Sequence, residues 1–243
     1  MSAALAIATR RPAARLRWVI SIWPALALAG NVDLLDGRPL YQLPESGSYE
    51  LPVIDRVEHH ELLDASGQRV PLLDVEPGAC AVVSFVYASC SDASGCPMVL
   101  ASLRRMDRAL ASNRALAGRV QLVTVSFDPV NDTPERLAIM RDHLKPLGAW
   151  HFRTAESDRE IRPVLDDFGQ DALRLVAAED GKSLGVIRHI AKVFLIDSDL
   201  AVRNIYSSGF LDLDILLRDV ETLLLDERRP SGSRSLEPMG SGR

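Results

Sequence analysis

The sequence predicts an α/β fold in which a mixed central sheet carries helices on both faces. The middle of the chain alternates runs of β-branched and aromatic residues with segments whose apolar residues repeat at helical spacing. Such alternation is typical of strands joined by crossover helices, and a hairpin followed by a helix later in the chain adds antiparallel strands. With 243 residues, 47% of them hydrophobic and 25% charged, the chain is long enough for one globular domain with appendages.

The first elements are predicted from three local patterns. Short apolar runs flank residues 65–68, ASGQ, so residues 61–73 are expected to form a hairpin. Residues 81–87, AVVSFVY, are β-branched or aromatic on both faces, which is typical of a strand buried on both sides. Pro97 then opens a helix in which the apolar residues at positions 99, 103, 106 and 110 form one stripe for a core.

The remaining elements are predicted in the same way. Residues 120–127, VQLVTVSF, are the next expected strand. Thr133 and Pro134 are an N-cap residue and a first-turn proline, which predict a helix beginning at Pro134. We further expect a weaker helix at 158–168, strands at 193–196 and 201–205, and a final helix at 213–224. This order of elements predicts a thioredoxin-like fold.

The N-terminal segment has the features of an export signal. Four arginines between residues 10 and 17 precede an apolar run at 18–29, and no acidic residue occurs before Asp33. The run ends in Ala-Leu-Ala, a pattern that signal peptidase cleaves, and it is shorter than the roughly 20 residues of a membrane span. We therefore expect export to the periplasm or to the outer face of the inner membrane. The alternatives are an uncleaved anchor that keeps the chain at the membrane and the lead helix of a cytosolic protein.

Four regions are expected along the chain. These are a signal peptide at 1–29, an extended arm or linker at 30–52, a thioredoxin-like domain at 53–227, and a disordered tail at 228–243. The arm is rich in Pro and Gly, and the tail consists mainly of Ser, Gly, Pro and Arg. The formal net charge of −5 gives no general attraction to phosphate backbones, so no nucleic-acid partner is expected.

Two cysteines, Cys90 and Cys96, flank a polar loop between the first central strand and the helix that begins at Pro97. Backbone N–H groups and the dipole at the start of a helix favour a thiolate, so we expect Cys96 to ionise more easily than a free cysteine. A thiolate is the nucleophile in disulfide exchange and also the soft ligand that suits Cu(I). On spacing alone, the pair is compatible with a structural disulfide, a redox pair or part of a metal site.

Three segments resemble the Sco/SenC family, whose members are thioredoxin-fold proteins that bind copper and help to assemble the copper centre of cytochrome c oxidase. The first is the strand into the cysteine loop, VVSFVYASC to GCP, at 82–97. The second is VTVSFDPVNDTPERL at 123–137, and the third is IRHIAKVFLID at 187–197. The segments occur in the family's order, and the similarity covers residues 50–226.

In that family two cysteines and a histidine bind the metal, which implies that Cys90, Cys96 and His189 are copper ligands here. Two thiolates and a neutral imidazole form a three-coordinate set that Cu(I) accepts. The resemblance also implies a copper chaperone, rather than an enzyme, that delivers copper to a cytochrome c oxidase subunit or another exported copper protein. In addition, we expect a reversible disulfide between Cys90 and Cys96, since a six-residue step can turn back to disulfide distance and leave Cys80 as the remaining thiol.

The cysteine loop departs from the family pattern. The family usually has CxxxC with proline after the first cysteine, whereas this chain has Ser91 there and two additional residues. A longer loop costs more to order when it binds a metal, so we expect weaker copper binding than in a short-loop relative.

Other functions on the same fold remain open at this point. A thiol–disulfide oxidoreductase that reduces a partner's cysteines would use Cys90 and Cys96 but would not need His189. A scaffold with a purely structural cysteine pair is a third class, and a peroxidase is less favoured because no threonine stands three residues before either cysteine.

Several nearby residues have both a functional and a structural interpretation. Asp92 is either the acidic residue of the family loop or a turn residue, and Met98 is either a thioether ligand or a packing residue. His59 and His60 are expected in a solvated turn, and Cys80 is expected to be a small buried residue of the central strand. Asp128 and Asp132 either orient the loop or cap turns before Pro134.

Overall fold

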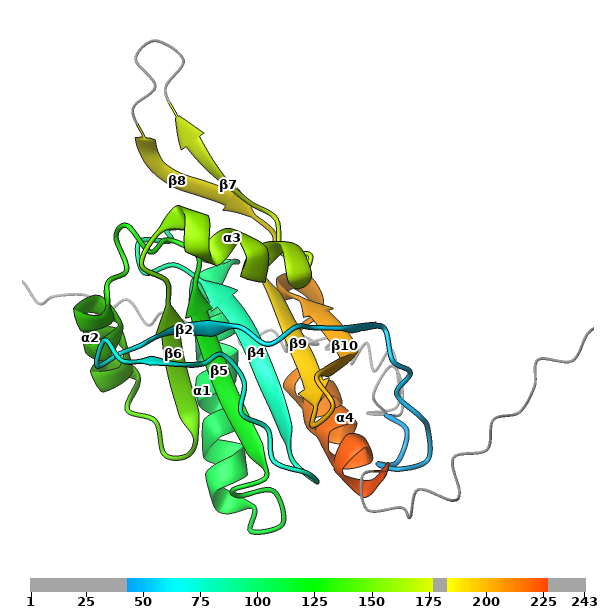
Figure 1. Ribbon diagram of the computed structural model, residues 1–243. Coiled ribbons are helices and arrows are strands. Elements are labelled where there is room, and N and C mark those ends of the chain that lie inside the picture. The colour runs from blue at the N-terminus through cyan, green and yellow to red at the C-terminus, as the bar shows by residue number, and fades with distance from the viewer. Residues whose placement is uncertain (1–42, 177–182, 227–243) are drawn as a thin grey trace, which may run out of the picture. The chain divides into compact units, whose positions relative to one another are not determined.

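The computed structural model describes residues 43–176 and 183–226, so the expected signal peptide and C-terminal tail lie outside it (Figure 1). The strands of its main sheet are β1 (Asp55–Arg56), β2 (Glu61–Asp64), β3 (Arg69–Pro71), β4 (Cys80–Val86), β5 (Val120–Ser126), β6 (Trp150–Thr154), β9 (Lys192–Asp197) and β10 (Ala201–Ser207). A separate two-stranded sheet is formed by β7 (Ala172–Val176) and β8 (Ser183–His189). The helices are α1 (Cys96–Ser112), α2 (Pro134–Leu144), α3 (Asp158–Asp167) and α4 (Leu213–Asp226), with a 3-10 turn at Ser208–Phe210.

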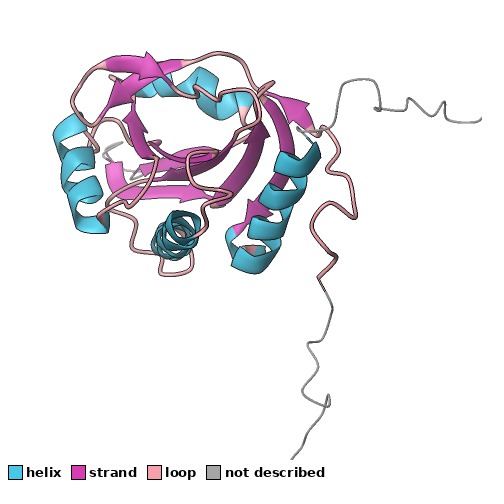
Figure 2. Cartoon of the chain, turned by 90° about the horizontal axis from the view of Figure 1, so that it is seen from below, coloured by secondary structure: helices cyan, strands magenta, loops and turns pink. Residues whose placement is uncertain are grey.

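The main sheet is mixed, as predicted. Its strand order within the described residues is β1-β10-β9-β4-β5-β6-β2-β3. The central strands β4, β5 and β6 run parallel, whereas β9 is antiparallel to β4 and β2 is antiparallel to β6. Helices lie on both sides of this sheet, with α1 and α4 on one face and α3 on the other (Figure 2). The expected thioredoxin-like arrangement of a mixed sheet between helices is therefore confirmed.

The core is built around β4. All seven of its residues are buried, because the strand pairs with β5 on one edge and β9 on the other while helices cover both faces. The ring of Phe85 in β4 lies 5.0 Å from that of Phe168 and 5.8 Å from that of Phe194, both in edge-to-face geometry. Cys80 is fully buried at the start of the strand, as expected.

Most predicted elements are present close to their predicted positions. They are the hairpin of β2 and β3, the strands β4, β5, β9 and β10, and all four helices. Thr133 occupies the N-cap position of α2, but its hydroxyl donates to the Glu135 carboxylate at 2.6 Å rather than capping the helix backbone. The sequence patterns did not predict four strands, which are β1, β6, β7 and β8. Strand β6, WHFRT, alternates between buried and half-buried side chains, but its five residues are too short a run to stand out in the sequence.

No helix within the described ranges is both long enough and apolar enough to cross a membrane. Residues 43–52 form no helix or strand. They lie against α4, where the hydroxyl of Tyr49 donates to Asp219 Oδ1 at 2.5 Å. Asp219 Oδ2 also accepts from Asn204 Nδ2 at 2.8 Å and from the hydroxyl of Tyr206 at 2.5 Å. The buried carboxylate thus joins the N-terminal arm, β10 and α4.

Replacing this carboxylate should destabilise the domain. In the Asp219→Ala variant three donors lose their acceptor in a buried or partly buried setting, so we expect the free energy of unfolding to fall by about 3 kcal/mol. Urea denaturation followed by circular dichroism measures the loss. Asp214 is exposed on the same helix, and Asp214→Ala should cost less than about 1 kcal/mol. Equal losses in the two variants would contradict this account of Asp219.

Candidate metal centre

Three chain segments place a soft donor set at one end of the sheet. Cys90 lies in the loop after β4, Cys96 is the first residue of α1, and His189 is the last residue of β8. One donor atom from each side chain lies within 4.8 Å of the others. In the described part of the chain, this is the one group of Cys, His, Asp and Glu donors close enough together to hold a metal ion. The structure therefore brings together the three residues that the sequence singled out.

The imidazole of His189 is oriented by its surroundings. Its Nδ1 lies 2.9 Å from the carbonyl oxygen of Ile187, and this contact fits Nδ1–H as the donor. Nε2 is then the acceptor, and it lies 3.4 Å from Cys96 Sγ. The rings of Tyr87 and Phe127 lie 5.5 Å and 4.9 Å from the imidazole. A backbone carbonyl and two aromatic rings thus aim one nitrogen at the sulfurs, as the outer shell of a metal site does.

The loop between the cysteines is ordered by a turn at Asp92. Its Oδ1 accepts from the backbone N–H of Ser94 at 3.0 Å and from the Ser94 hydroxyl at 2.6 Å. The Gly95 N–H donates to the Asp92 carbonyl at 3.0 Å. The bonds from Ser94 lower the pKa of Asp92, so its carboxylate serves the turn. The loop, although longer than the family pattern, already holds both sulfurs near the imidazole.

The ionisation of Cys96 differs from the sequence-based expectation. Burial raises the pKa of the Cys96 thiol to about 12, and the neighbouring Cys90 side chain adds to this shift. The residue is only 1% exposed, so the cost of taking a thiolate out of water outweighs the effect of the helix start. The prediction of an easily formed Cys96 thiolate was therefore wrong.

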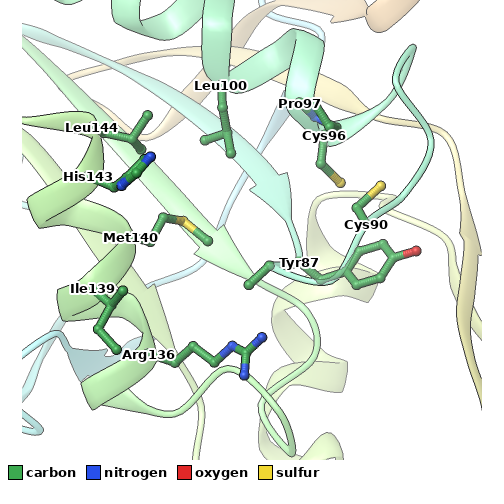
Figure 3. A pocket seen from close by; sticks show the side chains of 11 residues that line it. Tyr87, Cys90, Cys96, Pro97, Leu100, Arg136, Ile139, Met140, His143 and Leu144 are labelled. Carbon is green, nitrogen blue, oxygen red and sulfur yellow. The ribbon is translucent and has the colours of Figure 1, made fainter.

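The expected disulfide is not formed in this structure, in which Cys90 and Cys96 are both thiols. Their sulfurs point toward each other in Figure 3. The arrangement is that of a reduced pair beside an imidazole, and a reversible disulfide remains a prediction.

A pocket of about 400 Å³ lies beside the sulfurs, between α1 and α2 (Figure 3). Apolar side chains line most of it, including Tyr87, Leu100 and Met140. Arg136 and His143 on α2 add polar groups. Cys90 is partly exposed whereas Cys96 is buried, so Cys90 is the sulfur that a molecule from outside reaches more easily.

Four other candidate residues lie outside the donor set. Met98 is half-buried in the first turn of α1, and Cys80 lies at the start of β4, away from the cysteine loop. His59 is exposed as expected, but His60 is not in a solvated turn, because its Nε2 lies 2.9 Å from Asp167 Oδ2 in a partly buried pair. Sequence reasoning missed Tyr87 and Phe127, whose contacts with His189 arise only in the folded chain.

The fold and the donor set define a thioredoxin-like domain with one cysteine–cysteine–histidine centre. The sequence profile of the SCO1/SenC family matches residues 52–225, and the chain belongs to this family.

Solved structures show the same fold at low sequence identity. A SCO1/SenC family lipoprotein from Bacillus anthracis is 23% identical, with a TM-score of 0.58 over 71% of this chain and 96% of that one. Arabidopsis thaliana ScoI with copper bound is 21% identical, with a TM-score of 0.57 over 70% and 98%. Apo Sco1 from Thermus thermophilus is 22% identical, with a TM-score of 0.59 over 74% and 97%. A comparison with curated protein sequences found no match.

The two loop cysteines should differ in reactivity. In native, metal-free protein, we expect iodoacetamide to modify Cys90 well before Cys96, because Cys96 is buried and burial raises its pKa to about 12. A thiol with a raised pKa keeps its proton as the pH rises, so Cys96 should stay slow even at about pH 9. Mass mapping after timed alkylation measures both rates, and protein unfolded in urea is the control. Faster modification of Cys96 than of Cys90 in the native protein would contradict the account.

Proposed function

We propose that this chain is a copper-binding assembly protein, which carries Cu(I) on Cys90, Cys96 and His189 and delivers it to cytochrome c oxidase or another exported copper protein. The observation that carries the proposal is the set of two sulfurs and one imidazole nitrogen within 4.8 Å of one another. Metal–sulfur bonds of roughly 2.3 Å let one ion join donors up to about 4.6 Å apart, so small shifts suffice. Thiolates and imidazole together suit Cu(I), and membership of the SCO1/SenC family supports the same role.

Copper would be cargo at this site, held by groups that the fold has already arranged. His189 offers Nε2 because its Nδ1 lies in hydrogen-bonding contact with the Ile187 carbonyl. Cys96 gives up its thiol proton to solvent when it binds the cation, and the positive charge of the metal offsets the cost of a buried thiolate. Since Cys90 is the more exposed sulfur, an acceptor's ligand would replace Cys90 first.

The alternative is a thiol–disulfide oxidoreductase on the same fold. Its cysteine pair would be present, but a disulfide exchange reaction has no need for an imidazole directed at the sulfurs by a backbone carbonyl. The buried, protonated thiol of Cys96 is also a poor attacking group. Both features favour metal binding, and the role of His189 separates the two functions.

Removing the imidazole should therefore weaken copper binding. In His189→Ala we expect the Cu(I) affinity to fall more than about tenfold, since even the loss of an outer-shell partner costs that much. The Cys90–Cys96 disulfide should still form, because neither sulfur is changed. An anaerobic competition titration with a Cu(I) chelator measures the affinity. His59 is exposed and outside the donor set, so His59→Ala is the matched control and should bind as the wild type does.

Two results would overturn the proposed function. The first is a reduced wild-type protein that binds no Cu(I) at a one-to-one ratio. The second is a His189→Ala variant that binds copper normally while its cysteine pair changes only in redox potential, which would favour the oxidoreductase.

We also propose export, on the basis of the arginine-rich head and the apolar run at 18–29. In a bacterial host, cell fractionation should recover the chain in the periplasm or at the outer face of the inner membrane. N-terminal sequencing should begin near Gly30 if the signal is cleaved. A full-length, soluble cytosolic protein would contradict both the export and the delivery to an exported recipient.

A further inference from the structure

The three donors come from two separate parts of the chain, and one short turn contacts both parts. This turn, residues 128–132, connects β5 to α2 and is closed by a bond of 2.8 Å from the Asp132 N–H to the Asp128 carbonyl. Both of its aspartates are buried. The metal centre has two arms: the cysteine loop, which carries Cys90, and the β7–β8 hairpin, which carries His189. Each carboxylate contacts a residue of a different arm.

Asp132 holds the arm that carries Cys90. Its Oδ2 accepts from the backbone N–H of Ala88 at 2.8 Å and from the hydroxyl of Ser126 at 2.6 Å. Ala88 precedes Cys90 by two residues, and the Cys90 N–H donates to the Tyr87 carbonyl at 3.2 Å. The start of the cysteine loop is therefore tied to the end of β5.

Asp128 holds the arm that carries His189, and it does so through Arg174 of β7. The Arg174 guanidinium lies 2.7 Å from Asp128 Oδ1 and 3.3 Å from Asp158 Oδ1. Asn131 Nδ2 adds contacts of 3.1 and 2.9 Å to the two oxygens of Asp128. The Asp128 side chain is 2% exposed, so it needs this cation to offset its desolvation.

The register of the hairpin links Arg174 to His189. Arg174 pairs with Ile187 across the hairpin, and Ala172 pairs with His189. Ile187 is buried, and its carbonyl is the group in contact with His189 Nδ1. An anchor at Arg174 thus fixes the β8 residue that orients the imidazole.

This anchor matters because no ladder joins the hairpin to the main sheet within the described residues. Strands β7 and β8 pair only with each other among the described strands, and in Figure 1 the hairpin extends beyond the main sheet next to α3. Besides Arg174, the hairpin region is held by the burial of Ile187, by the packing of the His189 ring against Tyr87 and Phe127, and by Gln170 Nε2, which donates to the Ile190 carbonyl at 2.9 Å. Arg174 provides the only ion pairs seen between β7 and the rest of the described chain.

We propose that Arg174 is a positioning residue, which through its ion pair with Asp128 sets His189 at the correct distance from Cys90 and Cys96. The proposal rests on the proposed copper function, in which His189 is a ligand. Arg174 itself does not bind the metal. Its role is to attach the His189 arm to the same turn that holds the Cys90 arm.

A double-mutant cycle tests this role. Arg174→Met should lower the Cu(I) affinity about tenfold, the lower end of the loss for outer-shell changes, and Arg174→Lys should restore part of it. In a His189→Ala background, Arg174→Met should have less than about a twofold effect, because no imidazole is left to position. Arg188 is exposed on the same hairpin, and Arg188→Met is the matched control. An equal loss from Arg174→Met with and without His189 would overturn the proposal.

A second measurement needs no metal. Amide hydrogen exchange of apo protein should be faster in β7 and β8 of Arg174→Met than of wild type, with β4 and β5 unchanged. Unchanged exchange in the hairpin, or faster exchange throughout the sheet, would also overturn the proposal. If wild-type protein fails to bind Cu(I), the proposed function fails on its own, and the exchange result still decides whether Arg174 anchors the hairpin.

Discussion

The position of β4 is the constraint on which the rest of the structure depends. This strand is paired along both edges and buried on both faces, so it cannot shift without breaking two ladders and the core. The loop that carries Cys90 follows the end of β4, and the neighbouring strand β9 begins three residues after His189. His189 lies 93 positions after Cys96 in the sequence. The β4–β9 pairing nevertheless brings the cysteine loop and the histidine to the same end of the sheet.

The site contains one buried donor, the Cys96 thiol, which is costly to ionise. Burial keeps the proton on Cys96, while the contact of His189 Nδ1 with a backbone carbonyl directs Nε2 toward that thiol. In the absence of metal, the Cys96 thiol is therefore weakly reactive. A monovalent cation changes this balance, since it takes the place of the thiol proton and supplies the charge that a buried thiolate needs. Burial therefore protects the Cys96 sulfur from unspecific chemistry without removing its capacity to bind a soft metal.

Much of the fold and the identity of the site residues could be predicted from the sequence, because both rest on local patterns. The continuous apolar run of β4 and the helical stripe after Pro97 are visible without a structure, and motif resemblance pointed to His189. The ionisation of Cys96 could not be predicted, because helix position is local whereas desolvation depends on what packs around the sulfur. The contacts of Arg174 and Phe127 were missed for the same reason, since they form between segments far apart in the chain.

On the proposed function, one site imposed by the fold supplies two sulfurs and one nitrogen to a single copper ion. X-ray absorption spectroscopy of the reduced, Cu(I)-loaded protein tests this most directly, because it identifies the atoms bound to the metal. We expect two sulfur neighbours and one nitrogen neighbour per copper, with the nitrogen lost in His189→Ala. A copper shell of sulfur alone, unchanged by that substitution, would contradict the claim.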